Sequence, residues 1–230
     1  MRYYLHSSLV DYSKMELHNE YHWVEDLLKH VHFPCHALLV ASSPDEIEKT
    51  RHYAQEIVDV MDKHGLCLSG FNILDRNSAK CTKELVSKAD IIIAMGGHVP
   101  TQNAFFQEID LKKHIQDFHG IWIGSSAGSM NSAALVYAQP ELDGEVIDST
   151  YQRFVPGLGL TEKIILPHYS SWKNEVVDGF RLLEDVTYPD SQGHTFYLME
   201  DGSYVLGDTE EKIEKVVGEH YVLCDGVIVQ

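Results

Sequence analysis

Apolar runs of strand length alternate with longer segments of helical periodicity along much of the chain. The segments 36–41 (HALLVA), 90–95 (DIIIAM) and 120–124 (GIWIG) are almost continuously apolar, which is typical of strands buried on both faces of a parallel sheet. Further strands are expected near 67–73, 163–166, 195–199, 203–206 and 221–229. The pattern predicts an α/β fold built around a mostly parallel sheet.

Helices are predicted between these strands. Ser43 is a candidate N-cap, Pro44 suits the first helical position and Glu46 completes a capping box. Apolar residues then recur on one face as far as Met61, and Gly65 is a typical helix stop. Other helices are expected over 78–88, over 101–117, from the turn at 125–130 through Val136, and over 175–184.

Composition limits the classes of function. The 230 residues are 44% hydrophobic and 23% charged, without the run of about 18 apolar residues that a membrane span requires. With 35 acidic and 18 basic residues, the net charge of −17 repels phosphate backbones and anionic lipids. We expect one soluble domain spanning residues 1–230, with no nucleic-acid or membrane partner.

The four cysteines are scattered, with no C-x-x-C pair, and the first residues carry no signal-peptide core. These features predict a reduced, cytoplasmic protein. No self-complementary apolar patch can be identified in the sequence, so a monomer and a homodimer both remain open.

The strongest chemical signal is Gly124-Ser125-Ser126-Ala127-Gly128, which lies between a buried strand and a predicted helix. In that context G-x-S-x-G forms a nucleophile elbow, where a tight turn presents the serine hydroxyl at the carboxyl end of the sheet. The helix that follows directs its first amides to the same point, so the N–H of Ala127 is available to an oxyanion. A glycine- and serine-rich turn that only binds an anion is the alternative.

A second turn, Met95-Gly96-Gly97-His98, ends the preceding buried strand. Neighbouring parallel strands would place this turn beside the elbow, where the N–H of Gly97 could complete an oxyanion hole. A plain strand-ending turn is the alternative interpretation.

A serine nucleophile needs a base, and His168 stands just past the apolar segment 164–166. Most of the other 13 histidines lie in polar settings. His18 and His22 share a helical face, but no carboxylate or cysteine completes a recognisable ligand set. We therefore expect neither a metal site nor a cofactor.

Together, the GSSAGS elbow, the upstream GG turn and Pro167-His168 resemble the peptidase E and cyanophycinase family of serine peptidases. The resemblance spans roughly residues 38–205 and implies a class I glutamine amidotransferase-like fold, a three-layer sandwich. It also implies that Ser126 is the nucleophile, that His168 is the general base and that Gly97 and Ala127 form the oxyanion hole.

The third member of the triad stays open at this point. Counting from the serine, as peptidase E suggests, gives Glu141, with Asp143 two residues on; Glu200 matches a later glutamate–glycine segment of the family. Either glutamate could orient the imidazole and stabilise its cation, and we favour Glu200.

The sequence departs from the family pattern in two places that bear on substrate binding. The residue after the GG turn is His98, where family members commonly carry a small polar side chain. Peptidase E holds the substrate's N-terminal aspartate with an arginine downstream of its histidine. Here no arginine is clearly in register, and Arg181 or Lys173 is the candidate substitute.

These features predict a serine hydrolase that cleaves an amide bond of a small peptide, as an exopeptidase or dipeptidase with possible aspartyl specificity. Glutaminases of the same fold use cysteine and a histidine followed two residues later by glutamate, so that activity is disfavoured. A small-molecule amidase or esterase, and a binding or regulatory protein without catalysis, are the alternatives.

Overall fold

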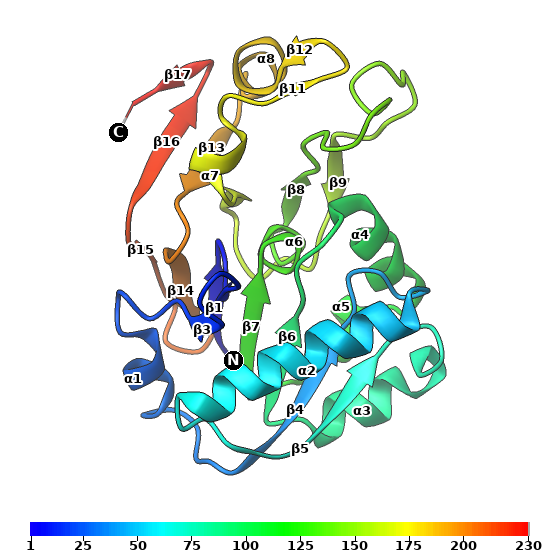
Figure 1. Cartoon of the computed structure of the whole chain (residues 1–230), viewed down its shortest axis with the longest axis vertical. Coiled ribbons are helices and arrows are strands. Elements are labelled where there is room, and N and C mark those ends of the chain that lie inside the picture. Colours follow the sequence, from blue (N-terminus) through cyan, green and yellow to red (C-terminus); the bar gives the residue numbers. More distant parts are fainter. Residues whose placement is uncertain (230) are drawn as a thin grey trace.

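The central element of the computed structural model, which describes residues 1–229, is a seven-stranded sheet (Figure 1). Its strand order is β15-β14-β1-β7-β6-β4-β5, and the five strands from β1 to β5 in this order are parallel. Strand β14 pairs antiparallel with β1, and β15 pairs antiparallel with β14. The strands are β1 (Arg2–His6), β4 (Cys35–Val40), β5 (Leu68–Leu74), β6 (Ile91–Ala94), β7 (Ile121–Ser125), β14 (Tyr204–Asp208) and β15 (Ile213–Val217).

Helices cover both faces of this sheet. On β4, Ala37 and Leu39 pack on one side with α1 and α2, whereas Leu38 and Val40 pack on the other side with α3, α4 and α5. Strands β6 and β7 alternate in the same way, so their apolar runs are buried on both faces, as predicted. The helices are α1 (Trp23–Leu27), α2 (Ile47–Lys63), the 3₁₀ turn η1 (Ala79–Cys81), α3 (Thr82–Lys88), α4 (Val99–Glu108) and α5 (Leu111–His114).

A second, four-stranded sheet lies beyond the carboxyl ends of the parallel strands (Figure 1). It has the order β10-β13-β16-β17 and packs with short helices around its own apolar cluster. The elements of this part are α6 (Ala127–Met130), β10 (Ile164–Leu166), α7 (Tyr169–Trp172), the π-helix η2 (Leu182–Thr187), α8 (Tyr188–Asp190), β13 (Thr195–Met199), β16 (His220–Cys224) and β17 (Val227–Ile228).

Three two-stranded pairs complete the structure: β2 (Val10–Asp11) with β3 (Glu16–Leu17), β8 (Leu135–Tyr137) with β9 (Phe154–Pro156), and β11 (Val176–Val177) with β12 (Phe180–Arg181). The predicted helix over 175–184 is therefore wrong at its start. Asp178 and Gly179, both with positive φ, form the two-residue turn of a hairpin, for which Asp-Gly is a strong signal.

Two other helix predictions need correction. Helix α2 starts at Ile47, and Ser43 does not cap it; instead the backbone carbonyl of Ser43 accepts hydrogen bonds from the amide of Glu46 and the hydroxyl of Thr50. Residues 42–45 are thus a loop. The helix after the elbow ends at Met130, and residues 135–137 form β8 because they pair with β9.

Strand β1 was not predicted, although it lies between β14 and β7 in the middle of the main sheet. Its charged residue Arg2 is buried through an ion pair with Asp26, 2.6 Å away, and through a hydrogen bond to Tyr4. Pairing from Arg2–Ile121 to His6–Ser125 brings the end of β1 beside the predicted elbow.

Candidate active site

Ser126 occupies a strained turn between β7 and α6. Its backbone has φ 51° and ψ −115°, a conformation that non-glycine residues adopt rarely and mostly at functional sites. The amide of Ser126 donates to the carbonyls of His6 and Ser7, at 3.1 and 3.2 Å, so the end of β1 holds this turn in place. The geometry is that of a nucleophile elbow.

The glycines around Ser126 allow close packing of the elbow. A Cβ at Gly128 would lie 2.1 Å from the carbonyl oxygen of Ala94, and one at Gly124 would lie 2.9 Å from the backbone nitrogen of Ser129. Both distances are shorter than any real Cβ contact. Gly128 therefore lets α6 approach β6, and Gly124 lets β7 approach α6, which explains why both positions of the G-x-S-x-G motif are glycine.

His168 lies at the end of β10 and bridges two other residues. Its Nε2 is 2.9 Å from Oγ of Ser126, and its Nδ1 is 2.6 Å from Oδ1 of Asp201. Because an ionised carboxylate can only accept, Nδ1 carries the proton and Nε2 is left to accept from the Ser126 hydroxyl. This orients the imidazole as a general base requires.

Asp201 follows β13 and has a second partner. The hydroxyl of Ser7, just past the end of β1, donates to Oδ1 of Asp201 at 2.8 Å and accepts from the amide of His168 at 2.9 Å. Burial by itself raises the pKa of Asp201, but the hydrogen bonds from His168 and Ser7 and the charge of His168 outweigh it. The pKa of Asp201 is thus held below its ordinary value, and the carboxylate is ionised at neutral pH.

The two glutamates proposed from the sequence do not contact His168. The carboxylate of Glu200 accepts from the hydroxyl and the amide of Ser170, at 2.7 and 3.2 Å. Glu141 lies 4.0 Å from the imidazole of His98, and burial raises its pKa. The structure therefore does not place the favoured Glu200, or Glu141, against His168, and the carboxylate that contacts His168 belongs to Asp201, the residue after Glu200.

Gly97 and Ala127, the predicted oxyanion-hole residues, lie on the two turns that meet at Ser126. A Cβ on Gly96 would be 3.2 Å from Cβ of Ser126, so the glycine turn after β6 touches the elbow. Gly97 itself has φ +151°, and a Cβ there would meet Oγ of Ser42 at 2.4 Å. Within residues 1–229, neither the amide of Gly97 nor that of Ala127 donates a hydrogen bond. Gly97 lines the cavity described below, whereas Ala127 is buried directly behind Ser126.

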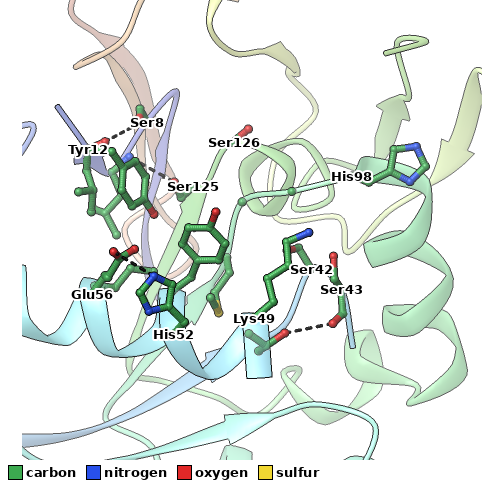
Figure 2. A pocket seen from close by; sticks show the side chains of 18 of the residues that line it. Ser8, Tyr12, Ser42, Ser43, Lys49, His52, Glu56, His98, Ser125 and Ser126 are labelled. Carbon is green, nitrogen blue, oxygen red and sulfur yellow. Dashed lines mark hydrogen bonds and ion pairs between the residues drawn. The ribbon is translucent and has the colours of Figure 1, made fainter. Parts of the chain in front are cut away.

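Ser126, His168 and Asp201 line a cavity of about 1110 Å³. Figure 2 shows Ser126 and the part of this cavity that lies over α2. The loop at 42–45, the first half of α2, the segment 8–12 and the turn after β6 form its walls. His98 also lines it, but the ring is turned away from Ser126 in Figure 2. The imidazole nitrogens of His98 contact Oγ1 of Thr101 at 2.7 Å and Oε1 of Glu145 at 2.8 Å.

Arg181 and Lys173 are not among the residues that line the cavity. The guanidinium of Arg181 forms an ion pair with Asp185 at 2.6 Å on the exposed β11–β12 hairpin. The ammonium of Lys173 donates to Oγ of Ser170 at 3.2 Å. The structure therefore does not place either predicted cation where a substrate on Ser126 would lie.

Residues 1–229 contain no group of three or more histidine, cysteine or acidic side chains arranged to hold a metal ion. None of the helices in the same range is long and apolar enough to cross a membrane.

Solved structures with the same fold include two peptidases. A candidate peptidase E protein from Listeria monocytogenes EGD-e is 17% identical, with a TM-score of 0.62 over 94% of this chain and 98% of that one. A peptidase from an acI-B1 Actinobacterium is 20% identical, with a TM-score of 0.62 over 97% of this chain and 91% of that one. No curated protein sequence matches the chain. A model of peptidase family S51 matches residues 37–214, most of the sequence, and the chain therefore belongs to this family of serine peptidases.

Proposed function

We propose that this protein hydrolyses short peptides through Ser126, His168 and Asp201. The hydroxyl of Ser126 attacks the carbonyl carbon of the scissile bond while Nε2 of His168 takes its proton. Asp201 keeps the imidazole in the required tautomer and stabilises its cation. The observation that carries the proposal is the position of His168, within 2.9 Å of Ser126 and 2.6 Å of Asp201.

The tetrahedral intermediate would place its oxyanion at the unpaired amides of Gly97 and Ala127. His168 then gives its proton to the departing amine, which leaves an acyl group on Ser126. A water molecule, deprotonated by His168, attacks this ester and releases the acid. All steps use groups of this chain and water, so the proposal includes no cofactor.

Short peptides fit the cavity better than folded proteins do. Its volume of about 1110 Å³ lies just above the range of roughly 300–1,000 Å³ that is typical of small-molecule sites. Among the described residues that line it, Lys49 is the only lysine or arginine. An aspartyl substrate would therefore depend on Lys49, whose ammonium lies 2.8 Å from Glu46.

The strand order and the elbow after β7 also support the proposed relation to class I glutamine amidotransferase-like folds. A serine at the elbow argues against glutaminase activity within that fold. All four cysteines are free, which supports the proposed location in the reducing cytoplasm.

A fluorophosphonate probe tests the proposal directly. We expect covalent labelling of the folded protein at Ser126, located by peptide mass spectrometry, and no labelling of Ser126→Ala. Ser125→Ala is the matched control, because it removes the neighbouring hydroxyl and should still be labelled. If folded protein is not labelled and a dipeptide library is not hydrolysed, the protein is a binding protein instead.

A further inference from the structure

One end of the active-site cavity is formed by an aromatic pair and two carboxylates. Asp11, Tyr12, Tyr53 and Glu56 all line the same cavity as Ser126, and we call this set the acidic–aromatic end. The rings of Tyr12 and Tyr53 meet edge to face, with centroids 6.2 Å apart and an interplanar angle of 83°. Both rings remain accessible, at 49% and 41% exposed. Figure 2 shows Tyr12 and Glu56 on the opposite side of Ser126 from His98.

Glu56 has an unused acceptor at this end. Its Oε2 is buried and has no hydrogen-bond partner in the described chain, and its Oε1 lies 3.4 Å from Nε2 of the exposed His52. A buried carboxylate oxygen without a partner is unfavourable, because desolvation is not offset. A donor from a bound ligand would remove this deficit.

The other carboxylates of the cavity have partners of their own. Asp45 is paired with Arg76 at 2.7 Å, Glu46 with Lys49 at 2.8 Å and Asp11 with Lys14 at 2.7 Å. Asp201 is held by His168. Among the carboxylates that line the cavity, Glu56 is thus the one without a lysine or arginine partner or a hydrogen bond to His168, and it is the best placed to bind a cation.

Tyrosine rings beside a carboxylate suit a protonated amine. The negative faces of aromatic rings attract cations, and a carboxylate adds a charge-assisted hydrogen bond. Burial and then the charge of Glu56 raise the pKa of Tyr12, so its phenol stays neutral at physiological pH. A carboxylate ligand at the same place would meet repulsion from Glu56 and Asp11.

We propose that the acidic–aromatic end binds the protonated amine of a lysine-like side chain next to the scissile bond, so that the preferred substrates are short peptides with a basic residue. The inference names the substrate class for the function proposed above and therefore rests on it. The opposite preference, for aspartyl peptides, would have to be served by Lys49.

Equilibrium binding to the Ser126→Ala protein tests the inference without any need for turnover. The probes are the dipeptides Lys-Gly and Gly-Lys, their norleucine counterparts, which lack only the ammonium, and their aspartate counterparts. We expect the better lysine dipeptide to bind about tenfold or more tightly than its norleucine counterpart. Adding Glu56→Gln should remove that difference.

Two further variants keep the result interpretable. Glu48→Gln removes the same charge from α2 at an exposed side chain outside the cavity, so it should preserve the lysine preference. Tyr53→Leu should weaken lysine binding, and Tyr53→Phe should retain it, because the ring and not the hydroxyl faces the cation. Thermal unfolding identifies any variant that fails to fold.

Equal binding of lysine and norleucine dipeptides, or tighter binding of aspartate, would overturn the inference. The proposed function fails separately, through absence of fluorophosphonate labelling at Ser126. An enzyme that is labelled and prefers aspartyl peptides, with the preference lost in Lys49→Met, refutes the substrate class and leaves the peptidase mechanism standing.

Discussion

The hydroxyl of Ser7 lies 2.8 Å from Oδ1 of Asp201. The same hydroxyl accepts the amide of His168, so a residue at the end of the first strand fixes both the acid and the base of the candidate triad. Ser7 is therefore a positioning residue: its hydroxyl acts on Ser126 through the other two, and its backbone carbonyl accepts from the amide of Ser126.

Replacing Ser7 by alanine tests this relationship. The variant loses one donor to the ionised carboxylate, which contributes roughly 1.5–3 kcal/mol, and one acceptor for the backbone amide of His168, which contributes about 1 kcal/mol. We expect kcat to fall by about tenfold or more while KM stays unchanged, because Ser7 is not among the residues that line the cavity.

Ser191→Ala is the matched control for this experiment. Ser191 is a buried serine outside the cavity whose Oγ donates to the carbonyl of Tyr188 and accepts from the amide of Gly226, so kcat should be close to that of the parent protein. A Ser7→Ala protein that folds and retains full kcat would show that Asp201 and His168 need no such support.

Replacing Asp201 by asparagine distinguishes its role from those of Glu200 and Glu141. Asp201→Asn can no longer hold the proton on Nδ1 of His168 and stabilise its cation, so we expect kcat to fall by roughly a thousandfold or more. Steady-state hydrolysis and the rate of fluorophosphonate labelling should fall together.

Glu200→Gln and Glu141→Gln are the controls for that loss. Glu200 bonds to Ser170, and Glu141 faces His98, so neither change should alter the tautomer of His168. Loss of turnover in Glu141→Gln, with Asp201→Asn active, would contradict the assignment of the acid.

Close packing at the elbow leads to a stability prediction. Alanine at Gly128 would place its Cβ 2.1 Å from the carbonyl oxygen of Ala94, where the contact is with backbone that cannot rotate away. We expect Gly128→Ala to lower the free energy of unfolding by about 3 kcal/mol or more. Chemical denaturation measures the change. At Gly70 an added Cβ would meet His36 at an ordinary 3.4 Å, so Gly70→Ala should cost much less.

The apolar core of the fold could be predicted because its signal is local. Strands β4, β6 and β7 are continuous runs of buried apolar residues, and the elbow follows one of them directly. Strand β1 has no such signal. Its sequence RYYLH begins with arginine and ends with histidine, and the burial of Arg2 depends on partners distant in sequence, chiefly Asp26.

The residues of the candidate site likewise fall into those that could be predicted from the sequence and those that could not. Ser126, Gly97 and His168 each follow a predicted strand, so the topology that brings them together is inherent in the pattern. The sequence offers Glu200 and Glu141 as the acid, whereas the carboxylate against His168 is that of Asp201, in the turn after β13. Which carboxylate faces His168 depends on where β13 ends relative to β10, and the sequence carries no local sign of it. Ser7 could be found only once β1 was known.

Buried His6 makes stability depend on pH. Neither ring nitrogen has a hydrogen-bond partner in the described chain, and the ring packs 4.7 Å from Trp23 and 5.1 Å from Tyr204. Burial, and then the charge of His18, lower the pKa of His6 to about 3, compared with about 6.5 in an unfolded chain. Between these values the unfolded state binds a proton that the folded state excludes.

Stability contributed by His6 is therefore complete above pH of about 6.5 and is lost as pH falls towards 3, at about 1 kcal/mol for each pH unit. His6→Phe keeps an aromatic ring of similar size and removes the titration, so its free energy of unfolding should fall less steeply with acid. Denaturant titrations at pH 7, 6 and 5 measure both slopes. Identical slopes for the parent and the variant would mean that His6 finds a proton acceptor, such as bound water, in the folded protein.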